Sequence, residues 1–364
     1  MPIDAKIRHF IKENGYIKID EMMKQVLSIH GESYYRNVKN IGSEGDFITS
    51  PEISQLFGET IALWAIRQVQ NIERQYLVQP KKFALVELGP GRGTMMRDLL
   101  RASKVVPEFF DRVEIYLYEI NPHFIKKQKE NLAAFNKNIT WIDNFAGLPK
   151  IPTIIISNEF FDALPVKQYF KVKDQWYEHV FIIDSVTEQI KYSKIDIHIN
   201  LRTQLSLDHI HAKDGAIFEE SIETLDIIRT LSKHIKNYRG AALIIDYGYN
   251  IEPRKRKREQ YNSTLQAIKN HRYTPIIDTL GEADLTAHVD FNAIEKAAKE
   301  QGIKEFNYGS QRDFLLFYGI EIRCEILRRN LPEQERYILD NQLQRLTAPH
   351  FMGELFKVLE FSNI

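Results

Sequence analysis

The sequence of 364 residues is poor in cysteine, has no excess of charge of either sign and contains no long apolar segment. Its one cysteine, Cys324, excludes an intrachain disulfide and a metal site built from several cysteines, and we expect no metal. Basic and acidic residues both number 49, which argues against a dedicated nucleic-acid-binding protein, whose phosphate contacts need surplus cations. No apolar run approaches the roughly 20 residues that span a bilayer, so no membrane insertion is expected.

The composition is that of a globular protein. Hydrophobic residues make up 43% of the chain, enough for a sizeable core. The length corresponds to one large domain or two fused ones, at about 150 residues per domain. Residues 1–23 mix acids and bases and have neither the apolar core of a signal peptide nor the Arg-rich, acid-poor pattern of a transit peptide. We therefore predict a cytoplasmic protein.

Strands and helices alternate from Lys82 onward. Continuously apolar runs predict strands over residues 83–88, 113–118, 139–142, 153–157 and 241–246. Because such runs are apolar on both faces, they indicate a parallel sheet covered by helices on both sides. The predicted fold class is α/β, a Rossmann-like sheet with a helical N-terminal segment and a β-rich insertion.

Four regions are predicted around this sheet. Residues 1–80 carry apolar residues at helical spacing and form a helical N-terminal segment, in which Ser50 is the expected N-cap of one well-marked helix. Residues 81–165 and 238–330 form the core of the fold, and residues 166–237 form a β-rich insertion subdomain. Residues 331–364 are predicted to form a C-terminal helical segment.

A glycine-rich turn follows the first predicted strand. Glu87 is followed by Gly89, Gly91 and Gly93, and glycine lets a ligand approach the backbone closely. The helix that follows offers free N–H groups and a positive dipole end. Thr94 stands where a dinucleotide-binding fingerprint needs Gly or Ala, and no Walker lysine is present, so neither NADH nor ATP is expected. The remaining pattern is typical of class I methyltransferases that use S-adenosylmethionine and release S-adenosylhomocysteine.

Acidic residues follow the next two predicted strands. Glu119 comes directly after the second strand, where it can accept both ribose hydroxyls of such a cofactor. Asp143 follows the third strand, near the expected position of the adenine amino group. A surface acid at a strand end and a helix-capping aspartate are the alternatives for these two residues.

The fourth predicted strand ends in a mixed acidic and aromatic segment, residues 158–165. In class I methyltransferases this edge faces the reactive methyl group, so Asn158 is assigned to the cofactor. Glu159 and Asp162 flank two phenylalanines and could hold a cation such as a guanidinium, which keeps its proton in water. The alternative is a helix start, where acids favour the dipole and the phenylalanines are core anchors.

Several longer motifs resemble the MidA family of methyltransferases over residues 40–360. The motifs that carry the resemblance lie at residues 45–54, 87–93, 158–165, 244–248 and 284–291. That family includes the mitochondrial methyltransferase that assists assembly of respiratory complex I.

The resemblance implies a cofactor, a substrate and further site residues. It implies S-adenosylmethionine as donor and an arginine of a complex I (NADH dehydrogenase) subunit as acceptor. The segment from Asp46 to Glu52, with Thr49 and Ser50, is expected to fold over the cofactor. The motif at residues 284–291 is expected near the acceptor, where His288 either accepts the released proton or has a structural role.

Other functions stay open at this stage. A non-catalytic assembly protein that keeps the cofactor pocket is one alternative, and methylation of a small molecule or RNA is another. The basic run at residues 254–258 is expected to be a solvated loop, and Cys324 an inert packed residue. The sequence leaves the oligomeric state open, and a homodimer is compatible with it.

Overall fold

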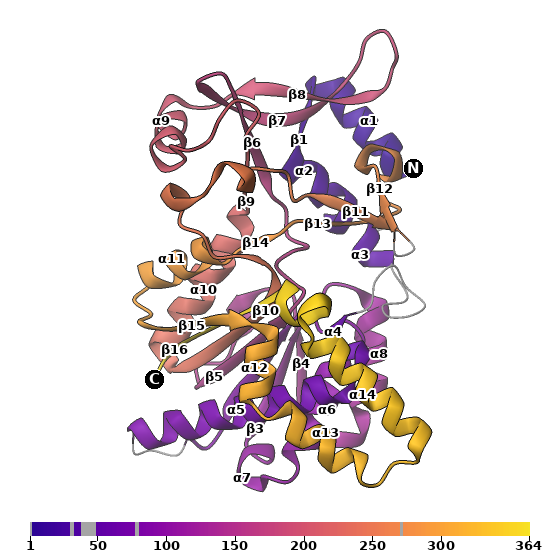
Figure 1. Cartoon of the computed structure of the whole chain (residues 1–364), viewed down its shortest axis with the longest axis vertical. Helices are drawn as coiled ribbons and strands as arrows, with labels where there is room; N and C mark the ends of the chain where they lie inside the picture. Colours follow the sequence, from indigo (N-terminus) through magenta and orange to yellow (C-terminus); the bar gives the residue numbers. More distant parts are fainter. Residues whose placement is uncertain (1, 30–32, 38–48, 77–79, 270–271) are drawn as a thin grey trace. The chain divides into compact units, whose positions relative to one another are not determined.

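The computed structural model describes residues 2–29, 33–37, 49–76, 80–269 and 272–364 (Figure 1). The chain divides into two compact units. One, here called the sheet unit, comprises Lys39–Phe161, Ile228–Gly248 and Glu295–Ile364. The other, here called the β-rich unit, comprises Met1–Val38, Asp162–Ile227 and Tyr249–Ile294.

The sheet unit contains a mixed sheet with the strand order β15-β16-β10-β5-β2-β3-β4. Strands β10, β5, β2, β3 and β4 pair parallel with one another, and β16 pairs antiparallel with both β10 and β15. The strands are β2 (Phe83–Leu88), β3 (Val113–Tyr118), β4 (Ile139–Ile142), β5 (Thr153–Asn158), β10 (Gly240–Tyr249), β15 (Glu305–Ser310) and β16 (Phe356–Asn363). The predicted α/β fold with a parallel sheet is confirmed.

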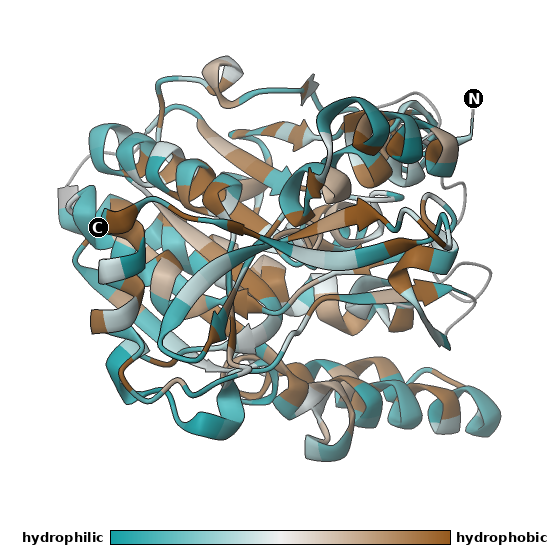
Figure 2. Cartoon of the chain, turned by 90° about the horizontal axis from the view of Figure 1, so that it is seen from above, coloured by the Kyte–Doolittle hydropathy of each residue, from teal (hydrophilic) through white to brown (hydrophobic). Residues whose placement is uncertain are grey.

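One face of this sheet packs against two helices, α5 (Gln55–Tyr76) and α6 (Thr94–Ser103) (Figure 1). Phe57 and Trp64 from α5 and Leu99 from α6 are fully buried in the same apolar cluster as alternate residues of the strands. Helices in Figure 2 alternate brown and teal along their length, as expected of helices with one apolar face. On each strand, therefore, every second side chain points to the helices of this face.

The start of the helix predicted from Ser50 differs from the expectation. Thr49 is the N-cap residue, and the short helix α4 (Ser50–Ile53) ends where Ser54 becomes extended. The longer helix α5 then begins at Gln55, and the hydroxyl of Ser54 accepts a hydrogen bond from the N–H of Leu56 at 3.4 Å. The local capping by Ser54 explains why one predicted helix is two.

The C-terminal region is helical only in part. Helices α12 (Gln311–Phe317), α13 (Ile320–Arg328) and α14 (Glu333–Thr347) are followed by β16, so the prediction of a helical segment over residues 331–364 is wrong at its end. The run from Phe356 to Asn363 forms hydrogen bonds on both sides, with β10 and β15. Pairing on two sides stabilises a strand where local helical spacing is absent. Cys324 on α13 is 3% exposed, as expected of a packed thiol.

The β-rich unit contains two antiparallel sheets. The larger has the order β1-β7-β6-β9, with β8 also paired to β7, and the smaller has the order β12-β11-β13. The strands are β1 (Ile17–Lys18), β6 (Lys167–Val172), β7 (Gln175–Ile183), β8 (Ile190–Asp196), β9 (Ile217–Glu220), β11 (Gln266–Lys269), β12 (Arg272–Thr274) and β13 (Asp284–Thr286).

The N-terminal helices belong to this unit, which differs from the predicted division at residues 80 and 166. Isoleucines at positions 3, 7 and 11 of helix α1 (Ile3–Asn14) are buried with Phe181 of β7 and Leu285 of β13. Helix α2 (Ile19–Lys24) contributes Met22 and Met23 to the same cluster. A shared apolar core therefore joins the first residues of the chain to the insertion and to residues 249–294.

The basic run at residues 254–258 is not a fully solvated loop, because its central residue is buried. Arg256 is 3% exposed, and its guanidinium lies 4.4 Å from the ring centroid of Tyr249 and 5.5 Å from that of Tyr261. It also forms an ion pair of 3.5 Å with Asp290. The aromatic rings and the carboxylate compensate the desolvated charge, which a reading of the charge run alone cannot reveal.

The pairing of β5 with β10 depends on Gly240. Its φ is +153°, and a Cβ atom there would lie 2.0 Å from the carbonyl oxygen of Thr153. We expect Gly240→Ala to lower the free energy of unfolding by about 2 kcal/mol or more, because the clash is with backbone. Chemical denaturation measures this change. Gly309→Ala, on β15 with nothing within 4 Å of the added carbon, is the matched control and should change stability by less than about 0.5 kcal/mol. Equal effects of the two substitutions would contradict the explanation.

Candidate functional site

The apolar rows on the α5–α6 face of the sheet end in polar residues. Leu85 on β2 is followed two residues later by Glu87, and Ile156 on β5 by Asn158. On β3, the buried Leu117 is followed two residues later by Glu119. Because side chains alternate along a strand and the strands are parallel, these three polar side chains lie at one carboxyl edge of one face. The structure therefore brings together three of the residues predicted to bind the cofactor.

The glycine turn next to this edge needs glycine for its backbone. Gly89, Gly91 and Gly93 have φ values of +62°, +52° and +77°. A Cβ on Gly89 would lie 2.9 Å from Cδ2 of Phe160. Gly93 is the N-cap residue of α6 and has no side chain to cap it, so the first N–H groups of that helix face a position without a Cβ. Such a cradle suits the close approach of a ligand.

Burial raises the pKa of both carboxyl groups at the edge. Glu87 is 2% exposed, and burial, with a further contribution from the charge of Glu119, raises its pKa to about 8. Burial raises the pKa of Glu119 to about 7, although the N–H groups of Asn121 and Ile120 and the amide of Gln128 donate to it and act in the opposite direction. The pKa values of both carboxyl groups at this edge therefore lie at or above neutral pH.

Two buried oxygens at the edge have no hydrogen-bond partner within the described part of the chain. They are Oε2 of Glu87 and Oδ1 of Asn158. The amide nitrogen of Asn158 donates to Oε1 of Glu159 at 3.0 Å. Since buried polar atoms in folded proteins are nearly always paired, these oxygens fit a bound ligand with hydrogen-bond donors. A cofactor with an amino group and ribose hydroxyls has such donors.

Asp143 is exposed after β4, and its carboxylate accepts a hydrogen bond from the side chain of Asn144 at 2.7 Å. The predicted contact between Asp143 and the adenine of the cofactor stays a prediction. Nearby, the rings of Tyr118 and Phe145 stack at 4.8 Å with an angle of 17°. This aromatic pair is not among the predicted site residues, although Tyr118 directly precedes Glu119 and Phe145 follows Asp143 by two residues.

Thr49 and Ser50 stand at the start of α4. The N–H of Ser50 donates to Oε1 of Glu159 at 3.3 Å, and its hydroxyl donates to the side chain of Gln311 at the same distance. Glu52 accepts a hydrogen bond of 2.5 Å from the hydroxyl of Thr94, at the first turn of α6. These contacts tie α4 to the glycine turn and to β5. Asp46, predicted to lie over the cofactor, is outside the described residues.

Glu159 follows β5 in a strained backbone conformation. Its φ is +50°, which is uncommon for a residue with a side chain. Its N–H donates to the carbonyl of Ile245 at 3.0 Å, so the strand pairing with β10 holds this conformation. Strain of this kind costs on the order of 1–3 kcal/mol and gathers at functional sites.

The other residues predicted for the acceptor belong to the β-rich unit. Asp162 and Asp284 are 5% and 3% exposed, and the hydroxyl of Tyr35 donates to Asp284 at 2.5 Å. Burial and the charges of both aspartates raise the pKa of Tyr35 well above its ordinary value, so both carboxylates act on the same hydroxyl. No local pattern identifies Tyr35 from sequence, because 249 positions separate it from Asp284.

His288 lies between Asp284 and Asp290 in the same unit. The backbone N–H of His288 donates to the hydroxyl of Thr264 at 2.8 Å. Burial lowers the pKa of its imidazole, while the charge of Glu219 acts in the opposite direction. A neutral imidazole can accept a proton, so both roles predicted for His288 are compatible with its surroundings.

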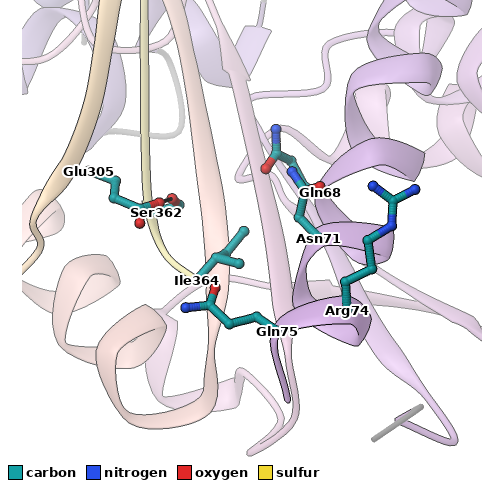
Figure 3. A pocket seen from close by; sticks show the side chains of 7 residues that line it. All are labelled: Gln68, Asn71, Arg74, Gln75, Glu305, Ser362 and Ile364. Carbon is teal, nitrogen blue, oxygen red and sulfur yellow. Dashed lines mark hydrogen bonds between the residues drawn. The ribbon is translucent and has the colours of Figure 1, made fainter. Parts of the chain in front are cut away.

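Two hollows lie in the described part of the sheet unit, away from the edge residues. One of about 350 Å³ is lined by polar side chains from the end of α5 and from β15 and β16, together with Ile364 (Figure 3). Another of about 420 Å³ lies at α4, the first turns of α6 and α14. Neither is lined by Glu87, Glu119 or Asn158.

The described residues contain no group of three or more His, Cys, Asp or Glu side chains placed to hold a metal ion. Among the helices within those residues, none is both long enough and apolar enough to cross a membrane.

A mainly parallel sheet with a glycine turn after β2 and carboxyl groups at the ends of β2 and β3 is the arrangement expected of a class I methyltransferase. Residues 60–309 match the family model described as S-adenosyl-L-methionine-dependent methyltransferase. The chain belongs to this family of methyltransferases, and S-adenosylmethionine is its cofactor.

Relatives and solved structures support the same assignment. A Burkholderia thailandensis protein, in a crystal structure with bound S-adenosyl-homocysteine, is 27% identical, with a TM-score of 0.86 over 99% of this chain and 92% of that one. The Drosophila melanogaster protein named "Protein arginine methyltransferase NDUFAF7 homolog, mitochondrial" is 31% identical over 97% of this chain and 83% of its own. The Xenopus laevis protein of the corresponding name is 30% identical, with the same coverage of each chain.

The names of these relatives correct one prediction. They are labelled mitochondrial, which points away from the cytoplasmic location predicted from residues 1–23. The composition of a short segment is weak evidence for a compartment, because the same folded enzyme can work in the cytoplasm or in a mitochondrion.

The raised pKa of Glu87 predicts how stability changes with pH in the protein without cofactor. The folded state holds a proton that the unfolded state, with a pKa near 4.5, releases, so this contribution is present at low pH and is lost as the pH rises through about 8. Glu87→Gln stays neutral. We expect its free energy of unfolding, relative to the original protein, to rise by on the order of 2 kcal/mol from pH 6 to pH 9.

Chemical denaturation at several pH values measures this difference. Glu130→Gln, on the exposed side of helix α8 (Pro122–Leu132), is the control and should leave the pH profile unchanged. A constant difference between Glu87→Gln and the original protein across this pH range would contradict the raised pKa.

Proposed function

We propose that this methyltransferase modifies an arginine side chain of a protein. The observation that carries the proposal is that two carboxyl groups, those of Glu159 and Asp162, come directly after β5 in the chain. A guanidinium keeps its charge at all working pH values, so a site for it needs carboxylates rather than a base that removes the proton beforehand. Relatives named as protein arginine methyltransferases, at 30–31% identity over 97% of this chain, favour the same acceptor.

The residues at the sheet edge are proposed to hold the cofactor. Glu119 accepts a hydrogen bond from a ribose hydroxyl, Glu87 and Asn158 offer their buried oxygens to donors of the cofactor, and the glycine turn lets the cofactor approach the backbone. We propose that Asp143 contacts the adenine and that Thr49 and Ser50 of α4 lie over the cofactor. The hydrogen bond between Glu52 and Thr94 supports this last assignment, because it joins α4 to the turn.

Methyl transfer to an arginine requires that the guanidinium be positioned more than that it be activated. When bound, S-adenosylmethionine supplies a strongly electrophilic methyl group. Glu159 and Asp162 are proposed to orient the guanidinium and to concentrate its charge away from the attacking nitrogen. Transfer of the methyl group would leave S-adenosylhomocysteine and make the attacking nitrogen more acidic, and its proton would pass to water or to the neutral imidazole of His288.

The identity of the protein substrate follows from resemblance. Because the MidA family includes an assembly factor of respiratory complex I, we propose an arginine of an NADH dehydrogenase subunit as the acceptor. Mass spectrometry of arginine methylation in cells with and without this chain tests the substrate class. Loss of methylation at a specific arginine supports the proposal, and an unchanged set of methylated arginines contradicts it.

Glu159→Gln tests the assigned role of the carboxylate. The amide keeps the shape but removes the charge, so we expect methyl transfer to fall on the order of 100-fold while the affinity for S-adenosylhomocysteine changes less than about threefold. Quantitative mass spectrometry measures the first, and calorimetry the second. Glu130→Gln again serves as the control. Unchanged turnover in both Glu159→Gln and Asp162→Asn would place the acceptor elsewhere, with Asp284 as the next candidate.

A further inference from the structure

Gln128 is a buried glutamine in the middle of α8. Its exposed fraction is 0%, while the neighbouring lysines at positions 126, 127 and 129 are exposed. The amide nitrogen donates to the carbonyl of Gly91 at 2.6 Å and to Oε2 of Glu119 at 3.2 Å. The amide oxygen accepts a hydrogen bond of 2.7 Å from the indole of Trp141 on β4. One side chain therefore joins the glycine turn, the end of β3 and β4.

These bonds decide which acceptor positions of Glu119 remain for a ligand. The N–H groups of Ile120 and Asn121 donate to Oε1 at 2.9 and 2.8 Å. Gln128 occupies one position on Oε2. An ionised carboxylate has about four acceptor positions, so the remaining one lies on Oε2 in a direction that Gln128 fixes.

We propose that Gln128 is a positioning residue for the cofactor, holding the carboxylate of Glu119 and the carbonyl of Gly91 in the orientation that receives the ribose. The proposal rests on the cofactor site proposed above, in which Glu119 binds the ribose. A fully bonded amide at this position fixes a single arrangement of turn and strand, as satisfied buried polar networks do.

The same amide also favours the ionised form of Glu119. Burial raises the pKa of Glu119 to about 7, and the Gln128 donor opposes that rise. The titratable group facing it is Glu87 from β2, whose pKa burial and the charge of Glu119 raise to about 8. From α8 and the turn before it come two uncharged donors, the side-chain amide of Gln128 and the backbone N–H of Asn121. Strand β4 contributes the indole of Trp141, which acts through Gln128. Loss of the donor should therefore raise the pKa of Glu119 and leave it protonated at neutral pH.

The test is the affinity for S-adenosylhomocysteine measured by calorimetry between pH 6 and pH 9, on the full chain. For Gln128→Met, which keeps length and volume, we expect binding about tenfold weaker at pH 7 and within about threefold of the original protein at pH 9. Lys126→Met, on the exposed side of the same helix, is the matched control and should bind as the original protein does at every pH.

Two more variants keep the proposal testable if Gln128→Met does not fold. Trp141→Phe removes the indole donor but leaves the bond from Gln128 to Glu119, so the pH midpoint of binding should stay in place. Gln128→Glu introduces a second carboxylate beside Glu119 and should weaken binding more strongly than Gln128→Met near neutral pH.

The outcomes separate this proposal from the one on which it rests. A loss of affinity by the same factor at every pH, or no loss, in Gln128→Met overturns the positioning role. If Glu119→Gln binds S-adenosylhomocysteine as tightly as the original protein, the proposed cofactor role of Glu119 fails instead.

Discussion

The burial of carboxyl groups at the carboxyl edge of a parallel sheet is the constraint on which the site depends. Parallel strands bring Glu87 and Glu119 to the same edge, directly beyond core residues that exclude water. Desolvation disfavours their charged forms, and their mutual repulsion adds to this for Glu87. Backbone donors and the amide of Gln128 compensate Glu119, whereas Oε2 of Glu87 has no hydrogen-bond partner within the described residues.

The path of the chain links the residues proposed to bind the cofactor to those proposed to bind the acceptor. Strand β5 ends in Asn158, at the cofactor edge, and Glu159 follows immediately in a left-handed conformation. At Phe161 the chain leaves the sheet unit, and Asp162 already belongs to the β-rich unit. A few residues thus lead from the sheet that carries the proposed cofactor site to the unit that contains Asp284 and His288.

Local sequence patterns predicted the centre of the fold closely. Strands β2, β3 and β4 have the predicted bounds because each is a mainly apolar run between polar turns. The polar residues at their ends were predictable for the same reason. Residues whose roles depend on distant partners were not: Gln128 resembles any polar residue of a surface helix, and Tyr35 meets Asp284 only in the folded chain. Strand β16 was missed because its partners, β10 and β15, lie far from it in the sequence.

The single thiol of the chain has a practical consequence. Cys324 is 3% exposed, and burial raises the pKa of its thiol, so it reacts slowly with maleimide or iodoacetamide probes. The folded protein is therefore a ready background for site-specific labelling. A cysteine introduced at Val105 or Val186, which are 82% and 88% exposed, would carry nearly the whole signal of a fluorescent or spin probe without any prior removal of native thiols.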